Sequence, residues 1–204
     1  MAMGAILYFD LGSPYVYLAV ERLDRFDLGV ITWRPVALGA IFKHTGRSSW
    51  GLSAEREAGM AEVAARARGY GLPPIRWPNG WPSNYLNANR ACTAAETQGG
   101  LEPFLRAALR AAFVDGEDLS QGEAIVEAAR RAGLDADRVL KEIGEPGVKQ
   151  RLREYTDEAV GAGIKGVPTL RIGNRLFWGD DQLEPAAAAA SGTRLTQDGP
   201  PQEL

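Results

Sequence analysis

The chain has very little cysteine and histidine. Its 204 residues include one of each, Cys92 and His44. A single cysteine cannot form an internal disulfide, and the two residues are too few for a His/Cys metal centre, so both kinds of site are excluded. A lone cysteine fits a reducing, cytoplasmic compartment in which thiol cofactors are available, and we expect that location.

A cluster of basic residues and a long apolar run are also missing. Lysine and arginine number 23 against 26 aspartates and glutamates, and the net charge is -3. Without a basic patch, nucleic acid and anionic membranes are not expected partners. No apolar run approaches the roughly 20 residues that span a bilayer. Residues 1–12 lack the basic start of a secretory signal, so we expect no such signal.

Strand patterns lie only at the two ends of the sequence. Residues 5–9 form an unbroken apolar run typical of a buried strand, and residues 30–33 resemble a second strand. Between them, residues 15–26 have helical character, which predicts a parallel β-α-β unit. Residues 169–172 and 175–178 flank a Gly-Asn pair and predict a β-hairpin. A short terminal helix should follow from Asp180 or Asp181.

The long middle segment, from about residue 37 to 163, is rich in Ala, Arg, Glu and Leu and predicts only helices. The expected helices cover residues 53–70, 84–98, 101–113, a helix opened by a capping box at 120–123, residues 135–143 and residues 146–159. This order predicts an α/β, thioredoxin-like fold with a helical insertion. Residues 1–36 and 164–190 would form the thioredoxin-like domain, 37–163 the inserted all-helical domain, and 191–204 a flexible polar tail.

The first predicted helix begins at a candidate anion site. Gly12 allows a sharp turn, Ser13 suits the N-cap, and Pro14 suits the first helical position. Redox-active thioredoxin-like domains carry Cys-x-x-Cys here, but this chain has Ser13-Pro14-Tyr15-Val16, so dithiol exchange at this site is excluded. A plain Ser-Pro helix start is the alternative reading of these residues.

Four stretches, in order from residue 5 to about 184, resemble the 2-hydroxychromene-2-carboxylate isomerases. These are bacterial relatives of kappa-class glutathione transferases within the wider DsbA-like group. Each stretch is a weak signal alone, and their order makes the match specific. The matching stretches are Tyr8-Phe9-Asp10 with Ser13-Pro14-Tyr15, residues 39–46, Trp81-Pro82-Ser83-Asn84, and Gly166-Val167-Pro168-Thr169 followed by Phe177-Trp178-Gly179-Asp180-Asp181.

The resemblance implies glutathione as cofactor, with its sulfur beside the Ser13 hydroxyl. A free thiol of pKa about 8.5 is mostly protonated at neutral pH, and a hydroxyl donor at a helix start favours the thiolate. In the family the proline that matches Pro168 is cis, which would let the Val167 backbone pair with the cysteinyl part of glutathione. A trans proline that merely opens an edge strand is the alternative.

The C-terminal signature adds four expected cofactor-binding residues, Trp178, Gly179, Asp180 and Asp181. Asp181 matches the family acid that binds the α-amino group of the γ-glutamyl unit. Asp180 stands where relatives often carry an amide or a hydroxyl. Two acids at a helix start also suit a simple capping role.

The expected substrate residues are Lys43, Trp81 and Asn84. Trp81, with Trp77, would present an aromatic wall to a ring, or would anchor the loop to the helices. Lys43 would meet a carboxylate or lie in solvent, and Asn84 would orient a polar group or cap a helix. Arg47 departs from the family, which commonly has asparagine there.

The resemblance therefore implies a glutathione-dependent cis–trans isomerase acting on a small aromatic acid of the 2-hydroxychromene-2-carboxylate type. The thiolate would add to the substrate, allow bond rotation and be expelled unchanged. A kappa-like transferase or peroxidase, and a non-catalytic thioredoxin-fold binding protein, are the alternatives. The family also suggests a possible homodimer. A periplasmic disulfide carrier is poorly supported, because the cysteine pair is missing.

Overall fold

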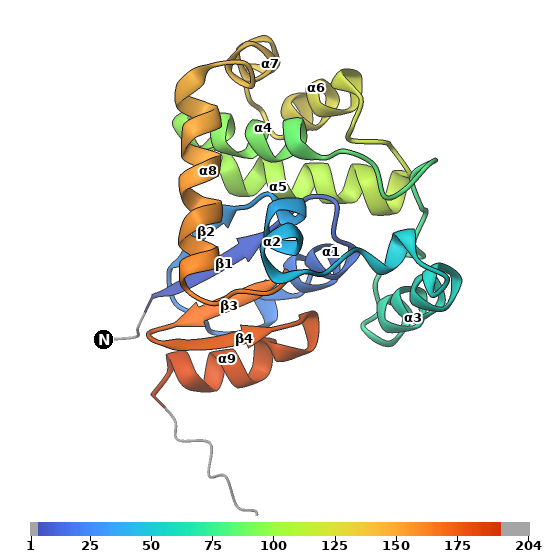
Figure 1. Cartoon of the computed structure of the whole chain (residues 1–204), viewed down its shortest axis with the longest axis vertical. Coiled ribbons are helices and arrows are strands. Elements are labelled where there is room, and N and C mark those ends of the chain that lie inside the picture. The colour runs from blue at the N-terminus through green and yellow to red at the C-terminus, as the bar shows by residue number, and fades with distance from the viewer. Residues whose placement is uncertain (1–3, 193–204) are drawn as a thin grey trace, which may run out of the picture.

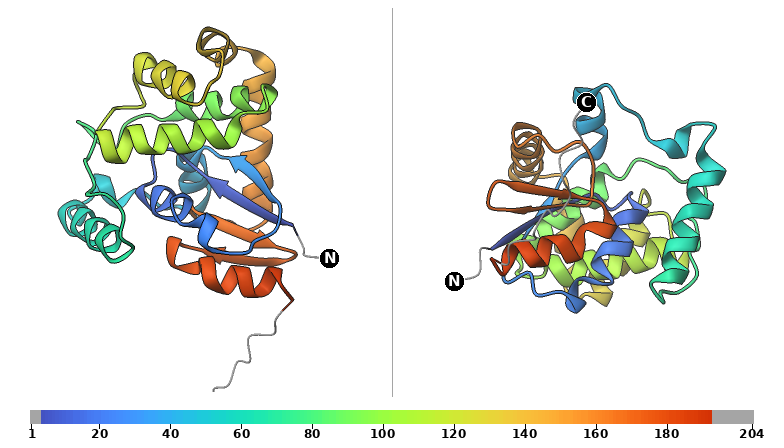
Figure 2. Two further views of the ribbon diagram at one scale, coloured as in Figure 1. Left: turned by 180° about the vertical axis from the view of Figure 1, so that it is seen from behind. Right: turned by 90° about the horizontal axis from the view of Figure 1, so that it is seen from below.

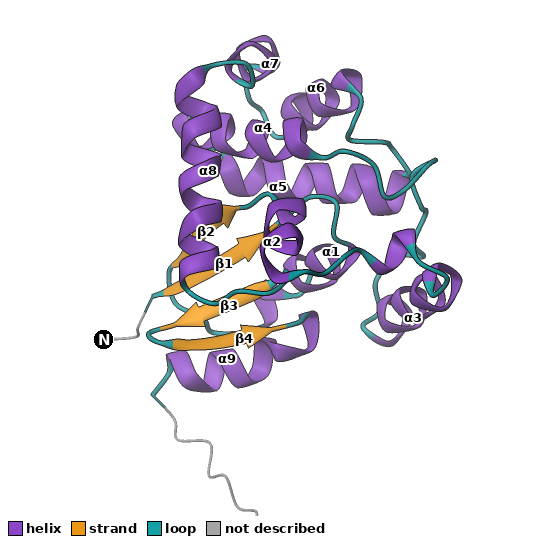
Figure 3. Ribbon diagram, viewed as in Figure 1, coloured by secondary structure: helices purple, strands orange, loops and turns teal. Residues whose placement is uncertain are grey.

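A computed structural model describes residues 4–192 of the chain. Its sheet has four strands in the order β2-β1-β3-β4 (Figure 3). β1 and β2 are parallel, whereas β3 is antiparallel to both β1 and β4. This mixed sheet confirms the predicted α/β thioredoxin-like fold. The strands are β1 (Ala5–Phe9), β2 (Ile31–Pro35), β3 (Thr169–Ile172) and β4 (Arg175–Trp178).

The strands form where the apolar runs predicted them. β1 is almost wholly buried, since it is an inner strand with neighbours on both sides. β2 begins one residue later than predicted, at Ile31, and continues to Pro35 opposite Phe9. The β-branched side chain of Val30 favoured a strand start at that residue, but Val30 lies outside β2 and is 81% exposed.

The first helix is shorter than predicted. α1 spans Pro14–Val20, and a 3₁₀ turn at Leu23–Arg25 replaces the rest of the expected 15–26 helix. A continuous helix would place Glu21 and Arg25 as an exposed i,i+4 pair, but α1 ends before them. Glu21 instead accepts two hydrogen bonds from Arg110, at 2.8 and 2.9 Å, whereas Arg25 donates to the Tyr70 carbonyl.

Helices alone connect β2 to β3, as the composition predicted. The helix at Leu38–Thr45 was not among the predicted ones. The boundaries of the others differ from the predicted ones by a few residues, and the last turn of the expected 101–113 helix is a π-helix at Ala111–Asp115. The α-helices of this segment are α2 (Leu38–Thr45), α3 (Arg56–Gly69), α4 (Leu86–Thr97), α5 (Leu101–Arg110), α6 (Gly122–Arg131), α7 (Ala136–Glu142) and α8 (Pro146–Gly161), with a 3₁₀ turn at Trp50–Leu52.

Two predicted helix starts have different outcomes. Asp135 caps α7 by accepting a hydrogen bond from the backbone N–H of Arg138, as expected. The capping box at Ser120 is wrong, because Gln121 is the N-cap of α6 and the Ser120 hydroxyl donates to Asp118. The preceding Asp118 competes successfully for this hydroxyl.

Helices cover both faces of the sheet. Figures 1 and 2 show α8 on one face and α1 together with α9 (Leu183–Ala190) on the other. α4 and α8 contact β2, and α9 contacts β3 and β4. One continuous apolar core joins these layers, and Tyr8, Phe9 and Phe104 are fully buried within it.

Within residues 4–192, none of the helices combines the length and the apolar character that crossing a membrane requires. The predicted polar tail begins with Ser191 and Gly192, which form a turn after α9, and its remaining residues lie outside the described part of the chain.

Candidate functional site

Ser13 occupies the predicted position at the start of α1. It is the N-cap residue, and Pro14 is the first residue of the helix. The Ser13 hydroxyl does not cap the helix, however. Its only partner within residues 4–192 is the Val167 carbonyl oxygen at 3.5 Å, which is long for an O–H···O bond. The hydroxyl is therefore available to donate to a ligand.

The Val167-Pro168 peptide bond faces Ser13 and is cis, as the resemblance implied. The Pro168 carbonyl accepts a hydrogen bond from the Gly179 N–H at 3.0 Å, which ties the bond to the end of β4. In the described part of the chain the Val167 N–H donates to no other group. An extended peptide could therefore pair with this backbone as an added strand.

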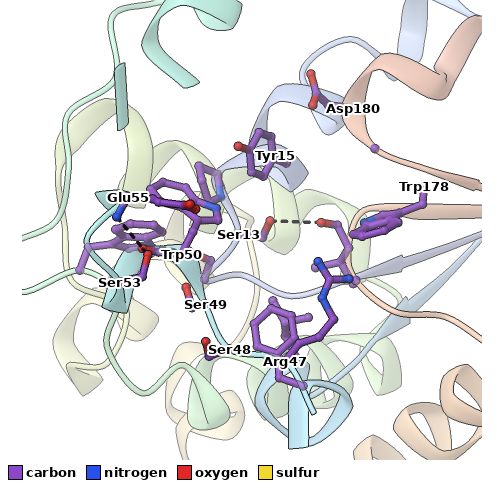
Figure 4. A pocket seen from close by; sticks show the side chains of 18 of the residues that line it. Ser13, Tyr15, Arg47, Ser48, Ser49, Trp50, Ser53, Glu55, Trp178 and Asp180 are labelled. Atoms are coloured by element: carbon purple, nitrogen blue, oxygen red, sulfur yellow. Dashed lines mark hydrogen bonds between the residues drawn. The ribbon is translucent and has the colours of Figure 1, made fainter. Parts of the chain in front are cut away.

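A cavity of about 830 Å³ opens over these groups, and we call it the Ser13 cavity. Figure 4 shows Ser13 near its centre, with Tyr15 and Asp180 to one side, Arg47 to another, and Trp50 opposite Trp178. Trp81, Val167, Gly179 and Asp181 also line it. Most of the predicted site residues thus converge on one cavity.

Asp180 and Asp181 have different environments. Asp180 is only 1% exposed, and its carboxylate accepts hydrogen bonds from Arg66 and from the Tyr70 hydroxyl, both at 2.8 Å. Burial raises the pKa of Asp180, and these two partners lower it only in part. Asp181 is exposed at the cavity wall. Of the two acids, only Asp181 is placed to meet a ligand cation.

Glycine is required at two positions around these acids. Gly179 has a φ of +127°, and a Cβ there would lie 2.4 Å from an Asp181 carboxylate oxygen. A Cβ at Gly166 would lie 2.7 Å from the indole nitrogen of Trp178. Gly166 thus allows the Trp178 ring to lie against the backbone next to Val167, and Gly179 allows the Asp181 carboxylate to lie against the Gly179 backbone. Trp178 itself is 49% exposed.

Trp50 and Trp81 form the opposite wall, and Trp77 packs against Trp81 without lining the cavity. The ring centroids of Trp50 and Trp81 are 4.9 Å apart, and those of Trp77 and Trp81 are 4.6 Å apart. The Trp81 indole N–H donates to the Gly12 carbonyl at 3.0 Å, beside Ser13. Trp81 therefore both lines the cavity and anchors its loop, and its contact with a substrate ring stays a prediction.

Lys43 and Asn84 do not line the Ser13 cavity. They line a neighbouring cavity of about 640 Å³, the Lys43 cavity, which shares Leu38, Phe42 and Arg47 with the first. Lys43 lies in the last turn of α2. Asn84 precedes the N-cap of α4, which is Tyr85, but its side chain still accepts a hydrogen bond from the Leu86 N–H, the first of the helix, at 3.0 Å. The three predicted substrate residues are thus divided between two cavities.

Sequence reasoning did not assign Tyr15, Trp50 or Arg47 to the site. Tyr15 follows Pro14 directly, and burial raises the pKa of its phenol, which keeps it neutral. Trp50 belongs to a segment that aligns poorly with the family, so nothing placed it. Arg47 was noticed as a departure from the family, and its guanidinium lies 4.8 Å from the Trp178 ring centroid. The departure of Arg47 from the family residue was the one sequence signal that pointed to any of these three residues.

Cys92 does not line the Ser13 cavity. Cys92 is fully buried in α4, and burial raises the pKa of its thiol well above the usual range, so it is a core residue. Among residues 4–192 there is no group of three or more His, Cys, Asp or Glu side chains that could hold a metal ion.

Comparison with known proteins agrees with this geometry. The sequence is 27% identical over 187 residues to a 2-hydroxychromene-2-carboxylate isomerase of Sphingobium xenophagum, covering 87% of this chain and 92% of the relative. It is 29% identical over 199 residues to human glutathione S-transferase kappa 1, covering 87% and 86%. A solved 2-hydroxychromene-2-carboxylate isomerase superposes with a TM-score of 0.81 at 22% identity, covering 93% and 95%.

These relatives confirm the resemblance drawn from the four sequence stretches. The family model described as a DSBA-like thioredoxin domain matches residues 6–190, which is nearly the whole chain. The chain therefore belongs to the DsbA-like thioredoxin family, with relatives among the 2-hydroxychromene-2-carboxylate isomerases and the kappa-class glutathione transferases.

Proposed function

We propose that the chain is a glutathione-dependent cis–trans isomerase of a small aromatic acid of the 2-hydroxychromene-2-carboxylate type. The observation that carries the proposal is the Ser13 hydroxyl, which lies in a large cavity opposite a cis Val167-Pro168 bond and, among residues 4–192, has only one hydrogen bond, a long one. Similarity to proteins named as such isomerases, and to one named glutathione S-transferase, supports it.

The residues around Ser13 fit glutathione. The Val167 N–H and C=O offer a donor and an acceptor to the cysteinyl unit. The Asp181 carboxylate, which is exposed at the wall, would bind the α-amino group of the γ-glutamyl unit. Trp178 and Gly179 would shape the wall between these two contacts. Asp180 would act indirectly, because its carboxylate is already occupied by Arg66 and Tyr70.

Bound glutathione would supply a thiolate that adds reversibly to a double bond of the substrate, permits rotation and leaves unchanged. Ser13 would hold this thiolate by donating its hydroxyl proton in a hydrogen bond, which stabilises the charged form. Ser13 would not attack the substrate itself, since a serine nucleophile needs an adjacent base. His44 is exposed on α2 and lines neither cavity.

The helix start contributes less than the sequence suggested. α1 has only seven residues, and its first residue is a proline without an N–H. We therefore assign the stabilisation of the thiolate chiefly to the Ser13 hydroxyl. A charge-assisted hydrogen bond of this kind contributes about 1.5–3 kcal/mol.

Isomerisation assays with and without glutathione test this proposal. We expect turnover of 2-hydroxychromene-2-carboxylate by the wild type with glutathione, none without it, and a loss of roughly 10- to 100-fold in Ser13→Ala. Ser120→Ala is a matched control, because its hydroxyl lies outside both cavities. Activity that persists without glutathione would contradict the proposal.

A kappa-like transferase is the second candidate, favoured by the 29% identity to the human kappa protein. Both reactions need the same stabilised thiolate. Accumulation of a glutathione conjugate from an aromatic halide, without isomerisation, would favour the transferase. A folded protein that binds no glutathione would instead be a thioredoxin-fold binding protein.

A further inference from the structure

Tyr15 carries a hydroxyl that no described residue uses. Its side chain lines the Ser13 cavity, and its hydroxyl forms no hydrogen bond within residues 4–192. The Tyr17 hydroxyl also lacks a partner in this part of the chain, but its oxygen is fully buried, whereas that of Tyr15 is not. The Tyr15 hydroxyl is therefore a donor that a ligand in the cavity can reach.

Packing holds the phenol ring of Tyr15 in place. The ring meets that of Trp50 edge to face, with centroids 6.3 Å apart, and the Arg66 guanidinium lies 5.6 Å from its centroid. Arg66 is itself held by ion pairs with Asp180 and Glu62, at 2.8 and 2.7 Å. Because these neighbours restrict the ring, the direction of the hydroxyl is set before a ligand binds.

Tyr15 lies between the position proposed for the sulfur and the aromatic wall. It belongs to the first turn of α1, two residues after Ser13, and its ring reaches Trp50 on the opposite wall. Figure 4 shows Ser13 and Tyr15 in the same cavity. The longer side chain of tyrosine carries its hydroxyl farther from the helix start than serine does. A substrate that packs on Trp50 while its reacting carbon meets a sulfur at Ser13 would pass beside Tyr15.

Addition of a thiolate to an unsaturated 2-oxo acid moves negative charge from sulfur to oxygen. The sulfur–carbon bond forms as the electron pair of the carbon–carbon double bond shifts toward the ketone, whose oxygen becomes an enolate oxygen. After rotation about the new single bond, expulsion of the thiolate reverses both changes, so the step consumes no proton and no oxidant. Ser13 would stabilise the charge only while it is on sulfur. The enolate oxygen therefore needs a donor of its own.

Tyr15 suits this role better than two other donors of the cavity. The Ser48 hydroxyl and the Trp178 indole N–H also have no partner within residues 4–192, but both residues are exposed, so water competes for the same oxygen. Tyr15 is half-buried, and burial raises the pKa of its phenol, with a further contribution from Glu62. The phenol therefore stays protonated at neutral pH and can donate.

We propose that the Tyr15 hydroxyl is a second catalytic group, which donates a hydrogen bond to the substrate oxygen that becomes negatively charged when the thiolate adds. This inference rests on the proposed function, because the charge on oxygen arises in the addition step. The two hydroxyls then act at different stages. Ser13 holds the thiolate before addition and after expulsion, and Tyr15 holds the enolate between them. The substrate class narrows to acids whose double bond is conjugated to a carbonyl group.

Tyr15→Phe removes only the hydroxyl and separates the two stages. We expect kcat for isomerisation at saturating glutathione to fall roughly 100-fold, while the affinity for glutathione and the thiol pKa of the complex stay as in the wild type. Ser13→Ala should instead raise that pKa. Unchanged kcat in Tyr15→Phe would overturn the proposal. So would weaker glutathione binding or a higher thiol pKa in this variant, because Tyr15 would then serve the cofactor.

Tyr17→Phe is the matched control. It removes the same atom from the same helix, but the Tyr17 hydroxyl is fully buried and Tyr17 lines neither the Ser13 cavity nor the Lys43 cavity. Turnover, glutathione affinity and thiol pKa should therefore all stay unchanged in Tyr17→Phe. An equal loss of kcat in both variants would overturn the role of Tyr15, because the loss would then come from α1 and not from a contact with the substrate.

Binding of 4-nitrophenolate distinguishes a failure of this proposal from a failure of the proposed function. Its anionic oxygen resembles an enolate oxygen, and its absorbance reports the ionised form. With S-methylglutathione present, which has no thiol, we expect the wild type to bind the phenolate about 10-fold more tightly than Tyr15→Phe, and nitrobenzene equally. That result in a wild type without isomerase activity would support the donor role while the isomerase proposal fails. Equal affinities of the two proteins for the phenolate would overturn the donor role.

Discussion

The Ser13 cavity has a sheet side, which includes Ser13, Val167 and Trp178, and a helix side, which includes Trp50 and Trp81. Different interactions hold the residues of the two sides in place. Ser13 follows β1 and Val167 precedes β3, and these strands pair from Tyr8 opposite Thr169 onward, so backbone pairing brings the two residues together. Trp50 and Trp81 lie outside the strands and are held by ring packing. The sheet side thus follows from chain topology, whereas the helix side depends on side-chain packing between distant segments.

Trp81→Ala should have the largest effect on stability. Trp81 is 3% exposed, packs between two other tryptophans and donates to the Gly12 carbonyl. Its truncation should lower the free energy of unfolding by about 4 kcal/mol, measured by denaturant titration. Trp178→Ala, on the sheet side, should cost much less because Trp178 is 49% exposed. Equal losses of unfolding free energy in Trp81→Ala and Trp178→Ala would contradict the distinction between the helix side and the sheet side.

Asp180→Ala should have the next largest effect. It leaves Arg66 and the Tyr70 hydroxyl without their buried partner, which should cost about 3 kcal/mol of unfolding free energy at neutral pH. Asp181→Ala is the neighbouring control and should stay within about 0.5 kcal/mol of the wild type. A large loss of stability in Asp181→Ala would contradict the assignment of the two acids.

The free energy of unfolding lost in Asp180→Ala should depend on pH. Burial raises the pKa of Asp180 above its ordinary value of 3.8, so the folded state holds this proton more tightly than the unfolded state. The part of the stabilisation that depends on this proton is fully present below the unfolded pKa and is lost as pH rises through the folded pKa. The difference in unfolding free energy between wild type and Asp180→Ala should therefore narrow from acid to neutral pH. A stability difference that widens from acid to neutral pH would contradict burial as the cause of the raised pKa of Asp180.

Asp181→Asn should have a smaller, purely functional effect. Loss of the exposed carboxylate should weaken glutathione binding roughly 10-fold, measured by calorimetry, because an ammonium–carboxylate contact is removed. Asp157→Asn removes an equal charge from an exposed position on α8 and should leave binding unchanged. Equal weakening of glutathione binding in Asp181→Asn and Asp157→Asn would show that the net charge of the protein, and not a contact with Asp181, sets the affinity.

Glu21→Gln should have the smallest effect. Glu21 accepts two hydrogen bonds from Arg110, but Arg110 is 60% exposed, so solvent screens the pair. We expect a loss of no more than about 1 kcal/mol in the free energy of unfolding. A loss comparable to that of Asp180→Ala would show that exposure does not separate these two ion pairs.

The sequence predicted the sheet and the sheet side of the cavity well. Apolar runs located the strands, and the motifs located Ser13, Val167 and Asp181, because these features depend on local patterns and strand order. Asp180 could not be separated from Asp181, since its partners Arg66 and Tyr70 lie more than 100 residues away in the sequence. Trp50 was not predicted for a related reason, because the packing of rings from distant loops produces no pattern in the local sequence.

The pKa of bound glutathione tests the central claim most directly. The thiolate absorbs in the ultraviolet, so its titration can be followed in the complexes of wild type and Ser13→Ala at equal saturation. We predict a thiol pKa below the free value of about 8.5 in the wild type, higher by about 1 to 2 in Ser13→Ala. The same pKa in both complexes, or no binding by folded wild-type protein, would contradict the role assigned to Ser13.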